Sequence, residues 1–383
     1  MNRAFSIYLD LTRFLAALVV FIVHAGYERF TDGLPILWRL QDFGNDAVMV
    51  FFVLSGFVIA YVADQKEKTI PDYVASRLAR LYSVGLPALV LTVLLDAIGT
   101  QISPAEYDGW WFTASYPVLR FIVNLFFANE LWFLSIRAFS NGPYWSLGYE
   151  FWYYVLFAAS FFLRGRVRIA AVAVLCLLIG PKILLLFPIW LLGVWVYHRI
   201  KSQPVRSTWG CSLFVGSMVL YALFRQLDGP ERLLALTTRG LGDAFVLNQL
   251  GWSGMFASSY ITGLLVALNF MGAAALAPPL GRLLLPLEKP IRYLAGFTFP
   301  LYLFHYPLLQ FLATFSKRFL PGQAQGAVVL LGTLLVIWVV GAWAERQKAP
   351  LKRFWLRLIL PLSRKMLPAG GHSSLKQGVN EKR

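Results

Sequence analysis

The sequence predicts an all-α integral membrane protein with about ten transmembrane helices. Hydrophobic residues make up 58% of the 383 residues, whereas charged residues make up only 14%. A soluble globular domain is nearer half apolar and one quarter charged. The apolar residues also occur in runs close to the roughly 20 residues that a helix needs to cross a bilayer. Many helices in lipid, rather than one large soluble core, account for both observations.

Hydropathy distributes the candidate helices along most of the chain. In order they are Leu9–Tyr27, Asn45–Ala63, Leu81–Gly99, Tyr144–Leu163, Arg168–Pro181, Ile183–His198, Trp209–Phe224, Ser258–Ala277, Ala295–Ala313 and Ala324–Ala344. Each is a largely apolar run that approaches the length of a membrane span. The fifth and sixth runs are short and nearly adjacent, so the sequence defines their boundaries less sharply than the others.

Basic residues in the loops predict how the helices are oriented. The net charge is +16, and the Lys and Arg residues lie between apolar runs, which fits the positive-inside rule better than nucleic-acid binding. A further apolar run, Pro117–Leu134, is interrupted by Arg120, Asn124, Asn129 and Glu130. If this run crossed the membrane, every later loop would invert and the basic C-terminal segment would lie outside. We therefore expect an interfacial or re-entrant segment there, with both termini in the cytoplasm.

The domain organisation follows from the same pattern. We expect a membrane domain over residues 1–345 and a basic cytoplasmic tail over 346–383, which becomes polar and disordered from Pro368 onward. The two cysteines, Cys176 and Cys211, lie inside apolar runs and form no metal-ligand spacing, so no metal site is expected. The first apolar run is superficially similar to a signal peptide, but Arg13 and His24 interrupt it, so we interpret it as a retained helix.

Arg13 and His24 are the first candidates for function, because ionisable residues inside membrane helices cost free energy unless they face protein or water. They are eleven residues apart, and Asp10 precedes Arg13 by one turn. This spacing puts both on one helix face, about 16 Å apart along the axis. They could address the two ends of one elongated substrate. Alternatively, Arg13 extends to the membrane surface and His24 forms hydrogen bonds between helices.

Arg77 and Arg80 stand at the inner entrance of the third helix, three residues apart and therefore on one face. Two neighbouring guanidinium groups suit the bidentate binding of phosphate. A basic anchor at the membrane surface is the commoner role of such residues and remains the alternative.

Glu150 follows the segment Tyr144–Tyr149 and enters the fourth helix from the outer side, at a depth comparable with that of His24. A carboxylate beside an imidazole can orient it and raise its basicity. Alternatively, Glu150 makes only structural hydrogen bonds in a water-filled vestibule.

His305 lies in the middle of the ninth helix, within the segment Tyr302–Pro307. Contact with lipid would be costly there, so His305 forms either a pocket wall or a hydrogen bond between helices. Pro307 leaves a backbone carbonyl without its helical partner, which favours a cavity. In the second helix, the small residues Ser55 and Gly56 indicate close helix packing.

Together these segments resemble the membrane-bound acyltransferase type 3 family, which includes enzymes that O-acetylate polysaccharides. The first helix is similar to the family's Arg-x10-His signature, with the usual Asp-x-x-Arg before it, and Phe51–Phe57 is similar to its FFxLSGF block. Arg77 to Arg80 match its Arg-x-x-Arg element, Trp145–Glu150 its WSLxxE block, and Tyr302–Pro307 its YLxHxP block. The matches stand in family order; Ser83 departs from the pattern, because proline is frequent at that position.

The resemblance implies acyl transfer from a cytoplasmic acyl-coenzyme A (acyl-CoA) to a hydroxyl of an acceptor at the outer side. Arg77, Arg80 and Arg13 are then the acyl-CoA-binding residues. His24 is the general base of a catalytic group that also contains Arg13 and Glu150. Further residues expected in the pocket are Asp10, Trp145, Ser55, Tyr302 and His305.

The resemblance thus implies an inner-membrane O-acyltransferase that moves an acetyl group, the family's common donor group, from acetyl-CoA to a surface polysaccharide or its lipid-linked precursor. No permanently bound cofactor is expected, and the partners are the bilayer, acyl-CoA and a glycan or lipid-linked sugar acceptor, with homo-oligomers left open. Trp110, Trp111 and Tyr116 suit either stacking on sugar rings or an interfacial aromatic belt. One alternative is a transporter of lipid-linked or acylated intermediates, whose pathway would also contain buried ionisable groups. The other is a purely structural subunit.

Overall fold

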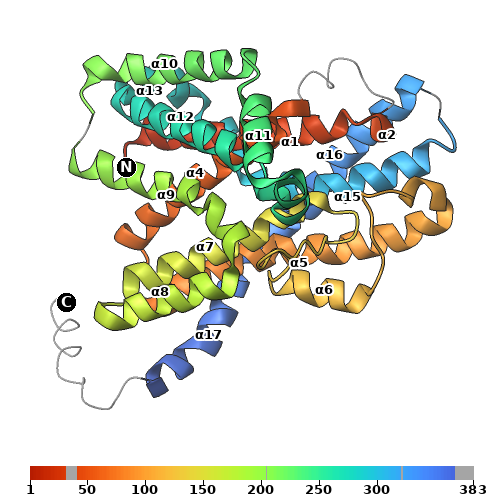
Figure 1. The fold of residues 1–383 in the computed structure, drawn as a ribbon, viewed down its shortest axis with the longest axis horizontal. Coiled ribbons are helices and arrows are strands. Elements are labelled where there is room, and N and C mark those ends of the chain that lie inside the picture. The colour runs from red at the N-terminus through yellow and green to blue at the C-terminus, as the bar shows by residue number, and fades with distance from the viewer. Residues whose placement is uncertain (32–40, 204, 321, 367–383) are drawn as a thin grey trace.

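The computed structural model describes residues 1–31, 41–203, 205–320 and 322–366, which form helices joined by loops (Figure 1). Among these residues the only β-type pairing is an isolated bridge between Ala138 and Asn141, so the all-α prediction is confirmed. The α-helices are α1 (Arg3–Ala25), α2 (Glu28–Thr31), α4 (Gly44–Gln65), α5 (Ile70–Ile102), α6 (Pro117–Leu125), α7 (Trp145–Phe162), α8 (Gly165–Ile179), α9 (Pro181–Ser202), α10 (Ser207–Gln226), α11 (Gly229–Leu241), α12 (Phe256–Ala275), α13 (Ala277–Leu284), α14 (Glu288–Gly296), α15 (Thr298–Ser316), α16 (Gly322–Arg346) and α17 (Lys348–Met366). Short 3-10 or π turns occupy Gln41–Phe43, Pro104–Tyr107, Gly142–Tyr144, Ala244–Gln249, Gly251–Ser253 and Leu285–Leu287.

Within the described residues, 7 helices are long and apolar enough to cross a membrane. They are α1, α4, α5, α9, α10, α12 and the stretch Ala324–Pro361, which runs from α16 into α17. The sequence also predicted spans at 144–163, 168–181 and 295–313, and α7, α8 and α15 form there but are shorter or less apolar than these 7. A multi-pass membrane protein is supported. The number of ten crossings and the cytoplasmic location of both termini remain predictions.

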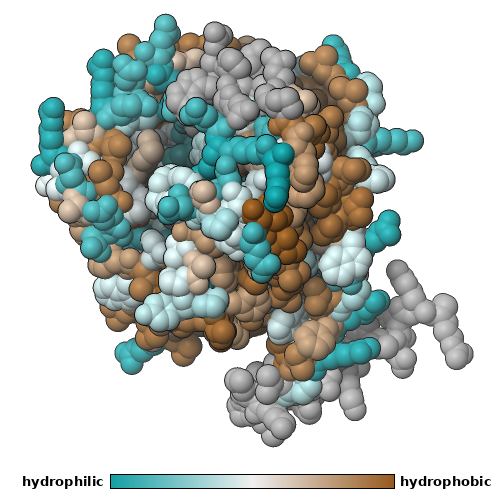
Figure 2. Space-filling view, turned by 90° about the vertical axis from the view of Figure 1, so that its right-hand side faces the viewer, coloured by the Kyte–Doolittle hydropathy of each residue, from teal (hydrophilic) through white to brown (hydrophobic). Residues whose placement is uncertain are grey.

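Exposed apolar side chains agree with a lipid environment. Leu331, Leu335 and Trp338 on α16 are exposed by 68%, 61% and 55%. Broad apolar patches cover much of the face in Figure 2, with hydrophilic side chains between and around them. A soluble monomer rarely exposes contiguous apolar surface on this scale, so lipid is the natural cover for these helices.

The closest helix contact lies between α4 and α9, where the sequence predicted tight packing from its small residues. A Cβ atom added to Gly56 would overlap the backbone oxygen of Trp190, and one added to Gly193 would overlap the backbone oxygen of Val53. Only glycine allows two helix backbones to approach this closely. The prediction of close packing at Ser55 and Gly56 is confirmed. The contact fixes Ser55 beside the interior of the bundle.

The segment expected to be re-entrant does not form a spanning helix. Its helix α6 has 9 residues, so it rises only about 14 Å, less than half of the bilayer's hydrocarbon thickness. The chain then continues as irregular backbone, with Asn129, Glu130 and Asn141 buried. Non-helical backbone is tolerated at membrane depth where it is enclosed by protein. The structure therefore favours the interfacial or re-entrant alternative for Pro117–Leu134.

A buried ion pair holds this segment to α9. The Nζ atom of Lys182 lies 2.5 Å from Oε2 of Glu130, and the two side chains are exposed by 0% and 2%. Lys182 also donates to Oγ of Ser135 at 2.7 Å and to the backbone oxygen of Leu134. Breaking such a pair leaves an uncompensated charge in a low-dielectric interior, which is strongly destabilising. Lys182 therefore anchors the irregular segment.

The side chains of α15 are buried along most of its length. It packs against α1, α5 and α16, and Figure 1 shows it alongside α16. The basic segment expected as a tail after residue 345 begins as α17, which packs along α5 and brings Trp355 within 5.7 Å of the Tyr82 ring. The stretch expected to be disordered from Pro368 lies outside the described residues.

Candidate active site

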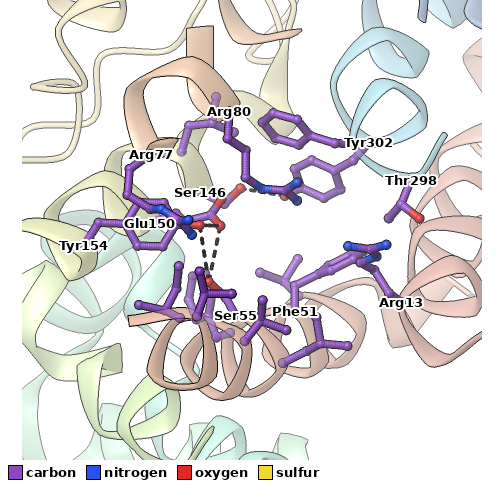
Figure 3. A pocket seen from close by; sticks show the side chains of 18 residues that line it. Arg13, Phe51, Ser55, Arg77, Arg80, Ser146, Glu150, Tyr154, Thr298 and Tyr302 are labelled. Carbon is purple, nitrogen blue, oxygen red and sulfur yellow. Dashed lines mark hydrogen bonds between the residues drawn. The ribbon is translucent and has the colours of Figure 1, made fainter. Parts of the chain in front are cut away.

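A cavity of about 250 Å³ lies between α1, α4, α5, α7 and α15 (Figure 3). Of the candidate residues, it is lined by Arg13, Arg77, Arg80, Glu150, Ser55 and Tyr302. The predicted acyl-CoA-binding residues therefore come together, although they belong to two helices that are distant in sequence. Tyr154, Thr298 and Phe299 also line the cavity and were not expected from the sequence.

Two of the three arginines have carboxylate partners. Nη2 of Arg13 lies 3.0 Å from Oδ1 of Asp10, whose other oxygen is 2.8 Å from Arg292. Asp10 thus belongs to the site through Arg13 rather than by lining the cavity. Arg77 donates to both oxygens of Glu67, at 2.8 and 3.0 Å. These ion pairs hold the guanidinium groups in place, which the spacing in the sequence could not show.

Arg80 differs from the other two, because no carboxylate of the described chain lies within 4.0 Å of its guanidinium group. The group lies over the ring of Phe299, 5.1 Å from its centroid. It also lies within electrostatic range of Glu150 and Tyr154, which point toward the same space in Figure 3. Arg80 therefore keeps its charge-assisted donors available for an anion in the cavity.

Glu150 lies in the cavity, but its hydrogen bonds differ from those expected. Its Oε1 accepts a hydrogen bond from Oγ of Ser55 at 3.3 Å and a short one from the hydroxyl of Tyr154. Trp190 in turn donates to Oγ of Ser55 at 3.2 Å. The described chain shows no contact between Glu150 and His24, so the expected orientation of the imidazole by this carboxylate is not seen. Tyr154 is one helical turn beyond Glu150, a spacing that could have suggested the pair.

The partner of His24 is His305. Nδ1 of His24 lies 2.8 Å from Nε2 of His305, and the two rings stack with centroids 5.0 Å apart. Nδ1 of His305 lies 2.8 Å from the backbone oxygen of Leu301. A carbonyl can only accept, so in the neutral ring this Nδ1 carries the proton and Nε2 carries the lone pair. His24 must then donate through Nδ1, and its own Nε2 is left as a lone pair.

This chain of hydrogen bonds prepares His24 as a base. Nε2 of His24 makes no hydrogen bond with the described residues, so it can accept a proton from a substrate. His305 is fully buried, and Tyr302, one turn before it on α15, lines the cavity. His24 and His305 do not line the cavity themselves, but the ring of Tyr302, which does, lies 6.4 Å from that of His305 and its hydroxyl bonds to Ser146 at 2.9 Å.

Two remaining candidates differ in their positions. Trp145 does not line the cavity; its ring stacks on that of Trp252 at 5.1 Å, with 6° between the planes. Trp111 lies 4.5 Å from the guanidinium carbon of Arg29, whose Nη2 donates to the hydroxyl of Tyr306. Arg29 and Tyr306 were not singled out in the sequence, since neither stands at a diagnostic spacing from His24.

Comparison with known proteins agrees with this geometry. Residues 6–342 match the family model of acyltransferase 3, described as an acyltransferase domain. The chain is 25% identical over 217 residues to the acyltransferase MdmB of Streptomyces mycarofaciens, covering 55% of this chain and 44% of that protein. It is 28% identical over 152 residues to an O-acetyl transferase of Shigella phage Sf6, covering 38% of this chain and 43% of that protein.

The chain thus aligns with less than half the length of either relative. No solved structure gives a significant match. The family match nevertheless extends over nearly the whole chain, including every helix that contributes to the cavity. This protein belongs to the acyltransferase 3 family.

Proposed function

We propose that the chain is a membrane O-acyltransferase that transfers an acetyl group from acetyl-CoA to a hydroxyl of a surface polysaccharide or its lipid-linked precursor. The family description and the names of both relatives, one of them an O-acetyl transferase, support the transfer of an acyl group to oxygen. The same descriptions support the enzyme over the transporter alternative. The inner membrane is the proposed location, because acetyl-CoA is supplied from the cytoplasm.

The donor's phosphates bind at the arginine end of the cavity. Arg80 offers guanidinium donors that no carboxylate of the described chain occupies within 4.0 Å, and Arg13 and Arg77 add positive charge beside it. The positive-inside rule gives this end a cytoplasmic location. The elongated pantetheine arm then extends through the cavity toward Tyr302, which brings the thioester near the imidazole pair.

The reaction follows from the state of His24. Its Nε2 accepts the proton of the acceptor hydroxyl while that oxygen attacks the thioester carbonyl. A carbon–oxygen bond forms and the carbon–sulfur bond breaks. The thiolate of CoA leaves and takes the proton from His24, so the products are an O-acetyl ester and free CoA.

The observation that carries this proposal is the hydrogen bond between His24 and His305, which leaves a lone pair on His24 next to an arginine-lined cavity. The test is to reconstitute the full chain with membranes that contain the cell's own glycans and to add acetyl-CoA labelled in the acetyl group. We expect label to become covalently attached to a glycan or a lipid-linked sugar. His24→Ala should reduce this transfer by about 10²-fold or more.

A matched control is His198→Ala, because His198 is exposed on α9 and lies outside the cavity. This variant should transfer label at the normal rate. Absence of transferred label with the unaltered protein would contradict the proposed function. Full activity of a folded His24→Ala variant would remove His24 from the reaction.

A further inference from the structure

A second basic site lies beside His24, away from the arginine-lined cavity. Its centre is Arg29, whose guanidinium carbon is 4.5 Å from the ring centroids of Phe30 and Trp111 and 5.5 Å from that of Tyr306. Arg137 approaches from the irregular segment; its Nη1 donates to the backbone oxygen of Trp111 at 2.8 Å. We call Arg29, Arg137, Tyr27, Trp111 and Tyr306 the arginine–aromatic cluster.

The charges of this cluster are not balanced within the described chain. No carboxylate of the described chain lies within 4.0 Å of either guanidinium group. The charge of Glu130 does act on Arg137, but Glu130 is already paired with Lys182. The buried Nε of Arg29 has no hydrogen-bond partner. Burial lowers the pKa of Arg137 from its usual value, and the positive charge of Arg29 lowers it further. A bound anion would relieve both effects.

The cluster is directly connected to the proposed base. The ring of Tyr306 contacts that of His24 with centroids 4.9 Å apart, and its hydroxyl accepts the hydrogen bond from Arg29. Tyr27 lies 5.4 Å from the His24 ring and within electrostatic range of both arginines. A group bound by Arg29 therefore lies close enough to the imidazole of His24 for a single sugar ring to reach both.

The donor's phosphates do not account for this site. Arg13, on the donor cavity, lies about 16 Å from His24 along the axis of α1, whereas Arg29 comes after the end of α1 on the opposite side of His24. The side chain of Trp110 is exposed by 74% and lies 5.2 Å from the guanidinium carbon of Arg137. Arg29, Trp111 and Arg137 are themselves half-buried within the described chain, so the cluster is part-exposed on the side of His24 away from the donor cavity.

We propose that the arginine–aromatic cluster is the acceptor subsite and that it recognises a sugar carrying a negative charge, either a carboxylate or a phosphate. The two arginines bind the anionic group, and the flat faces of Trp111 and Tyr27 contact the sugar ring. The neighbouring hydroxyl is then presented to Nε2 of His24. This inference rests on the proposed function and specifies its substrate class.

The test measures binding of three sugars to the full chain in lipid nanodiscs by titration calorimetry, with CoA present at saturation so that the donor site is occupied. Methyl glucuronide carries a carboxylate, glucose 1-phosphate carries a phosphate, and methyl glucoside is neutral. We expect at least one anionic sugar to bind about tenfold or more tightly than the neutral one, since hydrogen bonds to charged groups are the strong ones. The anionic sugar that binds more tightly than methyl glucoside shows whether the site recognises a carboxylate or a phosphate.

Arg29→Gln and Arg137→Gln should each abolish this preference. Arg239→Gln is the matched control, because Arg239 is exposed on α11 and lies outside the cluster. Unchanged binding of CoA shows that each variant is folded, since the donor cavity is separate. The inference is overturned if neither anionic sugar binds the unaltered chain more tightly than methyl glucoside, or if either variant keeps the preference. Neither result would affect the labelled acetyl transfer, which tests the proposed function independently.

Discussion

Nδ1 of His24 lies 2.8 Å from Nε2 of His305, although the two residues are 281 positions apart in the chain. Because neutral His305 donates its single ring proton from Nδ1 to the backbone oxygen of Leu301, its Nε2 can only accept, and this contact fixes which nitrogen of His24 carries a proton. A buried imidazole therefore takes the orienting role that a carboxylate often has beside a catalytic histidine.

The first prediction concerns His305 as a positioning residue. His305→Leu removes the acceptor for Nδ1 of His24, so we expect kcat to fall by about 10²-fold, within the range for general-base catalysis. The KM for acetyl-CoA should change little, because the arginines proposed to bind the donor line the cavity and His305 does not. Steady-state kinetics of labelled acetyl transfer measures both constants.

His305→Gln provides the control for this role. Its side-chain oxygen can accept the proton of Nδ1, so this variant should recover at least tenfold of the lost kcat. Equal losses in the Leu and Gln variants would show that His305 is needed for packing and does not set the state of His24.

The second prediction is that Arg80 binds a phosphate of the donor. Charge-assisted hydrogen bonds contribute about 1.5–3 kcal/mol, so Arg80→Ala should raise the KM for acetyl-CoA by roughly 10–150-fold. Acetyl-pantetheine lacks every phosphate, and the variant and the unaltered protein should therefore use it equally well. If Arg80→Ala raised the KM for both donors to the same extent, the guanidinium group would not act by binding a phosphate.

The third prediction separates Glu150 from His24. Glu150 bonds to Ser55 and Tyr154 and lies near Arg80, so its negative charge opposes that of the donor. Glu150→Gln should lower the KM for acetyl-CoA by a few-fold and change kcat by less than tenfold. A loss of kcat as large as that of His24→Ala would instead show that Glu150 helps to orient the imidazole of His24.

The fourth prediction concerns stability. Lys182→Met leaves Glu130 as an unpaired buried charge, so we expect a loss of about 3–5 kcal/mol in the free energy of unfolding. The double variant Lys182→Met with Glu130→Gln should recover a large part of this loss, because no charge then remains buried. Thermal unfolding in detergent, followed by size-exclusion chromatography, measures the difference.

The exposed pair of Lys201 and Asp64 is the control, with Nζ 2.7 Å from Oδ2 and side chains exposed by 52% and 25%. Lys201→Met should cost less than about 1 kcal/mol, because water screens surface ion pairs. Similar losses at Lys182 and Lys201 would mean that burial does not govern the strength of the inner pair.

Much of the site was predictable from local spacing. Arg13 and His24 are eleven positions apart, which puts both on one helix face; Arg13 lines the cavity and His24 bonds to His305 on α15. Arg77 and Arg80 share a face because they are three residues apart. Such relations depend only on helix geometry, so the sequence determines them before any helix packs.

The sequence by itself determined a membrane protein of helices, the family, and the ionisable residues that lipid would not tolerate. Only the tertiary structure decided their partners: His305 for His24, Tyr154 and Ser55 for Glu150, and Lys182 for Glu130. The physical reason is that composition and periodicity report how each segment meets lipid or water. A hydrogen bond between distant helices depends on how the packed helices are rotated and aligned, and no single segment contains that information.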